Sequence, residues 1–308
     1  MKKSILVISS ANVDILLRTT AFPKPGETLI YDGAVEYLPG GKGANSARAV
    51  KSLGADSIFV CRLGEDNNGK KLLDIYKNEG IDTRFITLDH WKPTGMAAVI
   101  TSNGQNSIVV YPGANYSLDS GTVEEAFTAY PDGALVQMEI PDEAIIAAGR
   151  FAAESGTKLV VDAGPAKPEL NFALMNGGID VFTPNETECE AYTGVYPENR
   201  ETALKACIAL EKMTGAKNIV LKLGERGAFA YDGVYSRIIA PYRVKAVDST
   251  GAGDVFSAAL AIKRAEGEKL FDAVQYANAA GAASVLKMGA YAPTEAEVKA
   301  IIDAQPMA

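Results

Sequence analysis

Short apolar runs alternate with amphipathic segments along most of the chain. Apolar positions at helical spacing predict helices near 43–54, 67–79, 142–155, 185–193 and 199–213. The apolar runs predict buried strands at 4–9, 57–61, 134–138, 158–162, 180–183 and 218–223. Near-continuous apolar strands separated by helices indicate an α/β fold, with a doubly wound, mostly parallel central sheet flanked by helices. In such sheets, ligands bind beyond the carboxyl ends of the strands.

Two segments, 15–38 and 95–111, break this alternation. In the second, "GMAAVIT" and "NSIVVYP" flank Ser102-Asn103-Gly104-Gln105, and Asn-Gly is a signal for a tight hairpin turn. Both segments predict antiparallel strands that form a small sheet projecting from the main one as a lid. An isolated sheet of this kind exposes an apolar face, so it should close on a substrate or pair with a second subunit.

The rest of the chain gives no sign of a second domain. The last 55 residues are predicted to be mostly helical, apart from a turn at 288–293, and no linker or repeat interrupts the sequence. We therefore expect residues 1–308 to form one domain, with the two lid segments as parts of it.

The charge balance narrows the range of partners. A net charge of −8 argues against a general nucleic-acid or anionic-membrane surface, because both need clustered Lys and Arg. Cys61, Cys189 and Cys207 form no CxxC pair, so neither a zinc site nor a disulfide framework is indicated, and a reducing cytoplasm is expected. The start "MKKSILVISSANVD" imitates a signal peptide, but Asn12 and Asp14 interrupt it, which favours a first strand. No apolar run approaches the ~20 residues of a membrane span.

A glycine-rich segment, "YLPGGKGANSA" at 37–47, resembles a phosphate-binding loop at first sight. That motif requires a glycine six residues before its lysine and a hydroxyl residue directly after it. Those positions hold Glu36 and Gly43, so the segment does not predict a triphosphate site of that kind.

A second glycine cluster, "VKAVDSTGAGDVFSAALAI" at 244–262, places small residues and a carboxylate at the start of an apolar helix. The unpaired N–H groups and the dipole of a first helical turn attract anions when glycines let a ligand approach. Asp254 would lie inside this turn, where it would either cap the helix or accept the proton of a hydroxyl that attacks a phosphoryl group. The combination favours phosphoryl transfer.

A third cluster, "TPNETECEAYTG" at 183–194, places Asn185 and Glu188 three residues apart at a helix start. The two share a helical face, and an amide with a carboxylate suits Mg²⁺, which takes only one or two protein ligands and keeps several waters. The same spacing is typical of a capping box, which is the favoured interpretation of this cluster taken alone. The single histidine, His90, is expected in a loop, so Ser-His-Asp and Cys-His hydrolases are not indicated.

Together these clusters resemble the ribokinase-like (phosphofructokinase B type) carbohydrate kinases over nearly the whole chain. "DSTGAGDVFSAA" at 248–259 matches the C-terminal hallmark of that family, and "GGKGANSA" from Gly40 matches its sugar-binding loop. The resemblance implies an ATP-dependent sugar kinase in which Asp254 is the catalytic base. It also implies that Gly251, Ala252 and Gly253 supply the amides of the anion hole.

The resemblance further implies which residues hold the ligands. The sugar would contact Asn12, Asp14, Gly41, Lys42, Asn45 and Glu139, besides Asp254. The nucleotide would contact Asn185, Lys222, Gly224, Gly227 and Asn278. Magnesium would be held by Asn185 and Glu188, and a monovalent cation, expected to be potassium, by Asp248, Thr250, Ser284, Lys287 and Gly289. A proline at 293 stands near the last position of the cation site, where the family usually has a small hydroxyl residue.

Other interpretations of these residues stay open at the level of sequence. A carboxylate and amides suit the paired hydroxyls of a sugar, yet without the family Asn12 and Asp14 would predict a turn at a strand end. Lys42 could equally be a surface lysine, and Lys222 a lysine at the end of a strand.

Within the family, "GGKGAN", Glu139 and "PGAN" at 112–115 follow the ribokinase pattern, so D-ribose is the first expectation for the substrate and ribose 5-phosphate for the product. Ser46 and the variant start "SSANVD" depart from it, which keeps deoxyribose, fructose, other pentoses and nucleosides open. A non-catalytic sugar sensor should lack the base or the metal pair, and a dinucleotide-dependent oxidoreductase needs GxGxxG where "SSANVD" stands. A homodimer through the lid strands is also expected.

Overall fold

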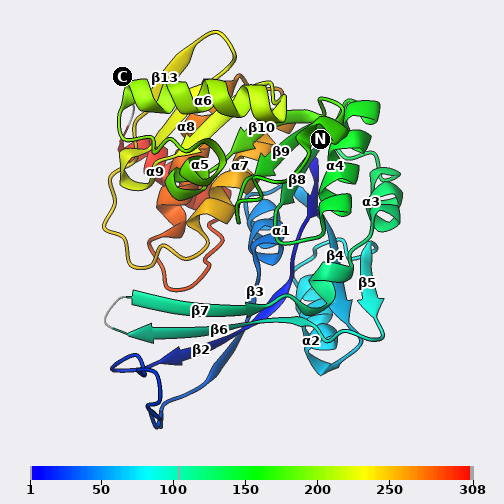
Figure 1. The fold of residues 1–308 in the computed structure, drawn as a ribbon, viewed down its shortest axis with the longest axis vertical. Coiled ribbons are helices and arrows are strands. Elements are labelled where there is room, and N and C mark those ends of the chain that lie inside the picture. Colours follow the sequence, from blue (N-terminus) through cyan, green and yellow to red (C-terminus); the bar gives the residue numbers. More distant parts are fainter. Residues whose placement is uncertain (1, 103–104, 306–308) are drawn as a thin grey trace.

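A mostly parallel sheet forms the centre of the computed structural model, which describes residues 2–102 and 105–305. Within these residues the sheet has nine strands in the order β13-β12-β11-β10-β9-β8-β1-β4-β5 (Figure 1). All neighbours from β5 to β11 pair in parallel, whereas β12 and β13 add an antiparallel edge. The strands are β1 (Ser4–Ile8), β4 (Asp56–Gly64), β5 (Ile86–Asp89), β8 (Gly133–Gln137), β9 (Lys158–Asp162), β10 (Ile179–Thr183), β11 (Asn218–Lys222), β12 (Ala228–Tyr231) and β13 (Ser236–Ile239).

Helices cover both faces of this sheet, because alternate strand residues point to opposite sides. Ile5 and Val7 of β1 join one buried cluster, and Leu6 and Ile8 join the other. The first cluster includes residues of α1 (Lys42–Ser52), α2 (Asn67–Asn78), α7 (Ala252–Ala265), α8 (Leu270–Ser284) and α9 (Glu295–Ala304). The second includes residues of α3 (Ser120–Phe127), α4 (Asp142–Ser155), α5 (Glu186–Thr193) and α6 (Arg200–Thr214). The doubly wound architecture expected from the sequence is confirmed.

Each predicted strand and helix is present, but four further strands and α-helices among the described residues were not predicted. These are β5, β12, β13 and α3, of which the strands are only four residues long and the helix eight. Such short elements show too few repeats for a period to stand out. The helical C-terminal region is confirmed as α7, α8 and α9. No helix among the described residues is both long and apolar enough to cross a membrane.

A separate four-stranded sheet, in the order β3-β2-β6-β7, projects from the main body (Figure 1). It consists of β2 (Asn12–Arg18), β3 (Glu36–Gly40), β6 (Gly95–Ser102) and β7 (Gln105–Tyr111). The expected antiparallel pairs β2–β3 and β6–β7 are present, and a parallel pairing of β2 with β6, which the sequence did not suggest, joins them. The predicted Asn103-Gly104 turn lies outside the described residues.

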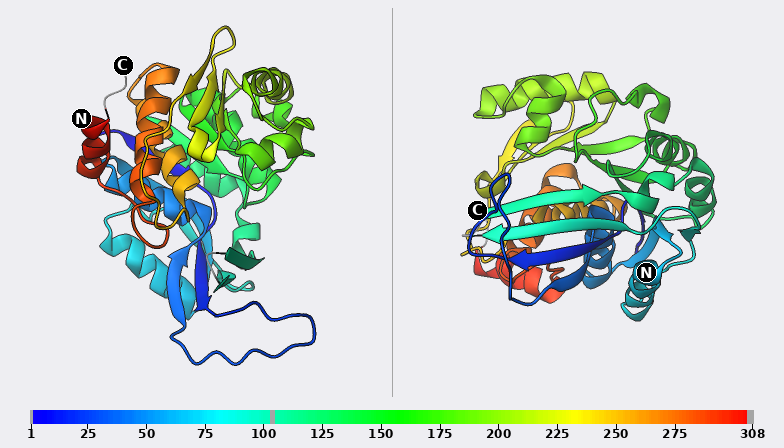
Figure 2. Two further views of the ribbon diagram at one scale, coloured as in Figure 1. Left: turned by 90° about the vertical axis from the view of Figure 1, so that its left-hand side faces the viewer. Right: turned by 60° about the horizontal axis from the view of Figure 1, so that its bottom comes forward.

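The connection between β2 and β3 extends away from this small sheet. Residues 19–35 contain no strand, and Figure 2 shows them as a long excursion beyond the strands. The expectation of strand structure across 15–38 therefore holds only for the two ends of that segment. Apolar side chains of the small sheet remain exposed, including Val109 at 71% and Tyr37 at 67%.

Candidate active site

Buried polar side chains gather at the carboxyl ends of β1, β8 and β9, beside the first turn of α7. Asn12, Gln137, Asp162 and Asp254 are all almost completely buried. Buried polar groups are costly unless they find partners, so their concentration at one edge of the sheet marks the candidate site. This edge is where ligands bind in doubly wound sheets.

Asp254 lies in the first turn of α7 and is only 4% exposed. Asn45 Nδ2 donates to its Oδ2 at 2.9 Å, and Gln137 Nε2 donates to its Oδ1 at 3.2 Å. The helix is capped by the backbone of Gly251 at φ 76° without a side-chain cap bond. The alternative that Asp254 serves as the helix cap is therefore wrong, and the carboxylate faces the candidate site.

The charge on Asp254 is balanced by its surroundings. Burial raises the pKa of this carboxyl to about 6, against the opposing effect of the Lys42 ammonium. Lys42 Nζ lies 3.9 Å from Asp254 Oδ1, and this carboxylate in turn raises the pKa of Lys42 above its usual range. A carboxylate with a pKa near neutrality is well matched to accept a proton at physiological pH.

Of the amides expected to form the anion hole, one is already engaged. Ala252 N–H donates to the Ser249 carbonyl at 3.2 Å. The backbone amides of Gly251 and Gly253 therefore remain as the donors expected to form the anion hole. Gly251 adopts a positive φ that favours glycine, and a Cβ there would lie 2.9 Å from the Cβ of Ala290.

The candidate sugar residues lie at the start of β2, which holds Asn12 and Asp14, and in the first turn of α1, which holds Asn45. Asn115 Nδ2 donates to Asn12 Oδ1 at 2.8 Å while Asn115 Oδ1 accepts from Ala11 N, so Asn115 fixes the orientation of the Asn12 amide. Asp14 Oδ1 and Asn45 Oδ1 are buried and without a hydrogen-bond partner in the described structure. Such acceptors suit the hydroxyl groups of a ligand.

Gly41 and Glu139 complete the sugar side of the site. Gly41 is the N-cap of α1 with φ 85°, and it brings that helix against Asn12 and Ala11. Glu139 accepts hydrogen bonds from the Ser10 hydroxyl and, at 3.3 Å, from the backbone N–H of Lys42. Its carboxylate therefore joins the end of β1 to the start of α1.

Asn185 and Glu188 form a capping box at the start of α5. Glu188 N donates to Asn185 Oδ1 and Asn185 N donates to Glu188 Oε2, both at 2.8 Å. The capping interpretation is thus correct for the geometry, and it leaves the other carboxylate oxygen, Oε1, directed at Gly164. No cluster of three or more His, Cys, Asp or Glu side chains suited to a metal occurs among residues 2–102 and 105–305. That is compatible with Mg²⁺, which needs few protein ligands.

Lys222 is the last residue of β11, and its Nζ would lie 3.8 Å from a Cβ placed on Gly253 of α7. Lys222 does end a strand, but it forms a 2.6 Å ion pair with Asp162 and is only 13% exposed, so its ammonium does not extend into solvent. Gly224 and Gly227 lie in the turn after β11, and Gly227 packs directly against the backbone at Ile239. Asn278 of α8 donates to the carbonyls of Ile239 and Ala240, both at 3.2 Å. The structure therefore brings the candidate nucleotide residues together.

The candidate cation residues are brought together only in part. Asp248 accepts from Thr250 N and Oγ1 and from Gly289 N, so its carboxylate ties two segments together. Ser284 Oγ bonds back to the Gly281 carbonyl within α8. Lys287 Nζ instead contacts Tyr291 and Glu297 on the surface. Any contribution of Ser284 or Lys287 to a cation site would therefore come from the backbone carbonyls.

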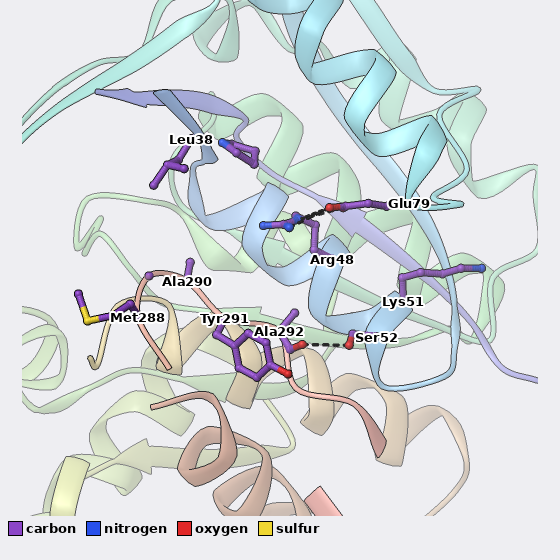
Figure 3. Close-up of a pocket in the computed structure, with 11 residues that line it drawn as sticks. Leu38, Arg48, Lys51, Ser52, Glu79, Met288, Ala290, Tyr291 and Ala292 are labelled. Atoms are coloured by element: carbon purple, nitrogen blue, oxygen red, sulfur yellow. Dashed lines mark hydrogen bonds and ion pairs between the residues drawn. The ribbon is translucent and has the colours of Figure 1, made fainter. Parts of the chain in front are cut away.

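A cavity of about 510 Å³ lies beside this site rather than in it. It is bordered by the end of β3, one face of α1 and residues 288–292, with the Arg48–Glu79 ion pair at its wall (Figure 3). None of the candidate catalytic or sugar residues lines it. Ala290, which lines this cavity, also lies next to Gly251. The cavity is therefore adjacent to the candidate anion hole.

Comparison with known proteins identifies the family. The profile of the pfkB family carbohydrate kinases matches residues 2–297. This chain belongs to that family. It is 36% identical over 302 residues to the ribokinase of Haemophilus influenzae, which covers 96% of this chain and 97% of that protein. It is also 31% identical over 255 residues to the deoxyribokinase of Salmonella typhi, which covers 82% of each chain.

The solved structure of a similar protein supports the same family assignment. Arabidopsis thaliana ribokinase complexed with ribose and ATP superimposes with a TM-score of 0.86 at 30% identity, covering 98% of this chain and 99% of that one. The chain is a ribokinase-like sugar kinase, a phosphotransferase that acts on an alcohol group. This enzyme class confirms the expectation from the two hallmark segments and excludes the oxidoreductase alternative.

Sequence reasoning missed several residues of this sugar kinase. Gln137 and Asp162 contact Asp254 and Lys222 respectively, and the Ser10 hydroxyl donates to Glu139. Asn115, which holds Asn12, lies in the "PGAN" segment that follows the ribokinase pattern, although the sequence assigned it no role. A signal was present for two of them, since Gln137 and Asp162 are the polar residues that end the apolar strands "GALVQ" and "KLVVD". A polar side chain at the carboxyl end of a parallel strand is a reason to suspect a functional site.

Asp14→Asn should make the unliganded kinase more stable at high pH. Burial, followed by repulsion from Glu139 and Asp254, raises the pKa of Asp14 to about 7. Between pH ~4 and ~7 the folded state therefore binds a proton that the unfolded state releases, so stability falls as pH rises through this window. We expect the stability advantage of the variant over the wild type to be about 2–3 kcal/mol larger at pH 8 than at pH 5. Urea unfolding at both values measures this, and a pH-independent difference would contradict it.

Proposed function

We propose that this kinase transfers the γ-phosphate of ATP to a primary hydroxyl of D-ribose and yields ribose 5-phosphate. The observation that carries the proposal is the buried carboxylate of Asp254, held by two amide donors beside the first turn of α7. Unpartnered acceptors on Asp14 and Asn45 provide a polar surface for a sugar next to it. The Arabidopsis ribokinase structure is a complex with ribose and ATP, which supports this choice.

In the proposed reaction Asp254 accepts the proton of the sugar hydroxyl as its oxygen attacks the γ-phosphorus. The bond from that phosphorus to the bridging oxygen breaks, and ADP leaves. Asn45 and Gln137 hold the carboxylate oriented for this step. The amides of Gly251 and Gly253 would stabilise charge on the migrating phosphoryl group, and Lys42 would add positive charge nearby.

Metal ions would be held at two places. Asn185 and Glu188 would hold Mg²⁺ directly or through water, and one carboxylate with one amide suits an ion that keeps most of its waters. Asp248 and Thr250 would hold a potassium ion beside α7, where their oxygen atoms already lie close together. Bound there, the two cations supply positive charge that offsets the phosphates of the substrate.

Deoxyribose is the second candidate substrate, because the Salmonella deoxyribokinase matches most of the chain. The first experiment is a coupled assay of ADP release with MgATP over ribose, deoxyribose, fructose, nucleosides and sugar phosphates, each with potassium or sodium as the monovalent cation. Turnover that is fastest with ribose supports the proposal, and faster turnover of another sugar replaces it. Sugar binding without turnover on the whole panel would indicate a sensor. Equal rates in the two salts would contradict the potassium site.

The rate of this reaction should depend on pH through Asp254. Because its pKa is raised to about 6, the proton-accepting form is present above pH ~6 and is lost as pH falls through that value. We expect kcat/KM to fall about tenfold per unit below pH ~6. A profile that stays flat down to pH 5 would show that another group accepts the proton.

The small sheet is proposed to act as a lid within a single kinase domain and as the contact of a homodimer. Apolar side chains on β3 and β7, such as Tyr37, Val109 and Val110, are exposed, which favours contact between this sheet and another surface. Closure over the sugar would exclude water that could otherwise react with ATP. Sedimentation as a monomer with and without sugar would contradict the dimer.

A further inference from the structure

The cavity beside α1 has the size of a small-molecule site. Its volume of about 510 Å³ lies within the range of about 300–1,000 Å³ that is usual for such sites. The end of β3, one face of α1, Glu79 directly after α2, and residues 288–292 form its walls. Sites of this kind combine apolar walls with a few polar groups that fix the orientation of a ligand. Both features are present here.

Apolar side chains on two walls of the cavity are left partly open to solvent. Leu38 of β3 is 39% exposed, and Met288 on the opposite wall is 61% exposed. Pro39, Ala290 and Ala292 add further apolar surface to the same cavity. A ligand with an apolar body would remove this surface from water, which favours binding.

The guanidinium of Arg48 is held by Glu79 and leaves one edge free. Nε donates to both carboxylate oxygens of Glu79, at 3.0 and 2.9 Å, and Nη2 donates to Oε1 at 2.8 Å. Nη1 has no hydrogen-bond partner within the part of the chain that the structure describes. Figure 3 shows this end of Arg48 directed away from Glu79, toward the side of the cavity where Leu38 and Ala290 lie. The outer edge of a guanidinium can bind a second anion through two parallel N–H bonds.

The ammonium of Lys51, one turn further along α1, has a different direction. Lys51 Nζ lies 3.6 Å from Asp56 Oδ1, and it would lie 3.7 Å from a Cβ placed on Gly80. Figure 3 shows this ammonium on the side away from Leu38 and Ala290. Arg48 is therefore the cation that a ligand in the cavity would meet, and it selects for a negative charge.

The walls of this cavity belong to two parts of the kinase that border its proposed substrates. Leu38 pairs with Asp14 across β3 and β2, so one wall is continuous with the sugar side of the site. On the opposite wall, Ala290 lies next to Gly251 at the start of α7. A ligand that packs on both walls would bind with a different affinity when their separation changes. Such a difference in affinity is what an effector requires.

We propose that this cavity is an effector site for a small organic anion, with a carboxylate or phosphate group on an apolar body. The anionic group would bind the outer edge of Arg48, and the apolar body would pack between Leu38 and Met288. None of the candidate sugar or nucleotide residues lines the cavity, so the ligand would not compete directly with either substrate.

The fluorescent dye anilinonaphthalene sulfonate is a suitable first probe, because it carries an anionic group on an apolar ring system and brightens in apolar surroundings. Titrations with and without saturating ADP separate the cavity from the nucleotide side, where the same dye could bind. Hexanoate, phenyl phosphate and the neutral hexanol are then tested as competitors. These titrations need no turnover, so they decide the site whichever sugar the kinase phosphorylates.

Two variants remove the guanidinium, and a third is the matched control. Arg48→Gln leaves Glu79 without its partner, so the neutral double variant Arg48→Gln/Glu79→Gln separates the loss of the donor from repulsion by a free carboxylate. Lys51→Met removes an ammonium from the same helix, but one that is directed away from the cavity. The midpoint of urea unfolding shows that each variant is folded.

The wild type should bind the dye in the presence of ADP, and both Arg48 variants should bind it at least about tenfold more weakly. Lys51→Met should stay within about twofold of the wild type. Hexanoate or phenyl phosphate should displace the dye, and the more effective of the two identifies the anionic group, whereas hexanol should not displace it. Equal dye affinity in the wild type and the neutral double variant, or displacement by hexanol as strong as by the anions, would overturn the proposal.

The effector role is tested with the sugar that the kinase phosphorylates. Coupling between two sites is reciprocal, so the sugar should change the affinity for the more effective anion by the factor by which that anion changes the affinity for the sugar. By calorimetry we expect a factor of at least about three in the wild type and none in the neutral double variant. A sugar affinity that neither anion changes would show that the cavity is not an effector site.

Discussion

Asp254→Asn is expected to lower kcat about 10²- to 10⁴-fold while leaving the affinity for the sugar within a few-fold of wild type. The substitution removes the group that accepts the hydroxyl proton but keeps the size and shape of the side chain. Coupled ADP release with the sugar selected by the panel gives kcat, and calorimetry gives the affinity. The loss should dominate every other single substitution at the site.

The side-chain amides around Asp254 should limit the stability that Asp254→Asn loses. Asn45 Nδ2 and Gln137 Nε2 both donate to the carboxylate of Asp254. In the asparagine variant one of the two accepting oxygens is replaced by an NH₂ group, which is a donor. Asn45 carries a buried, unpartnered Oδ1, so rotation of its amide would restore a matching bond. We therefore expect less than about 2 kcal/mol of lost stability.

Gln137→Met is a second variant in which a smaller loss of kcat is expected than in Asp254→Asn. It keeps the base but removes one of the two donors that orient it, so kcat should fall by about tenfold and no more. If Asp254→Asn retained more than a tenth of the wild-type kcat, the base would have to be another residue. If both variants lost activity equally, the orientation of Asp254 and not its proton affinity would be limiting.

The parts of this site that the sequence predicted are those that local patterns encode. "DSTGAGDVFSAA" places the glycine turn and Asp254 on one continuous helix start, so their mutual geometry is set within one segment. Asn185 and Glu188 are likewise fixed by a single capping box. The apolar runs predicted the parallel sheet, because each strand is buried on both faces.

The parts that were missed depend on pairing between distant segments. Asp162 and Lys222 are 60 residues apart and meet only because β9 and β11 flank β10. The parallel pairing of β2 with β6 joins segments more than 80 residues apart, and neither strand alone shows which neighbour it will have. Local periodicity carries no information on strand order, so it cannot show which residues of distant strands will meet, even where each residue is a candidate by itself.

Gly43→Ala should lower kcat/KM for the sugar about 100-fold and destabilise the protein by about 1–3 kcal/mol. Gly43 lies in the first turn of α1, where a Cβ would stand 2.5 Å from the Ser10 carbonyl oxygen and 2.6 Å from Ser9 Cβ. The Ala44 N–H donates to that same carbonyl, so the helix start is docked directly on the end of β1. A methyl group must push the two apart, and Lys42 and Asn45 would move with the helix. Steady-state kinetics and urea unfolding measure the two effects.

Gly121→Ala provides the matched control, since Gly121 occupies the corresponding second position of α3 and is exposed. A Cβ there meets only the Asp119 side chain, at 3.3 Å. Alanine is favoured over glycine in a helix by about 0.5–1 kcal/mol, so the control should be as stable as wild type or slightly more stable, with unchanged kinetics. The same substitution would then have opposite effects at two helix starts, because only α1 is docked on the backbone that precedes Asn12 and Asp14. Wild-type kinetics in Gly43→Ala would mean that the close approach of α1 to β1 is not needed for sugar binding.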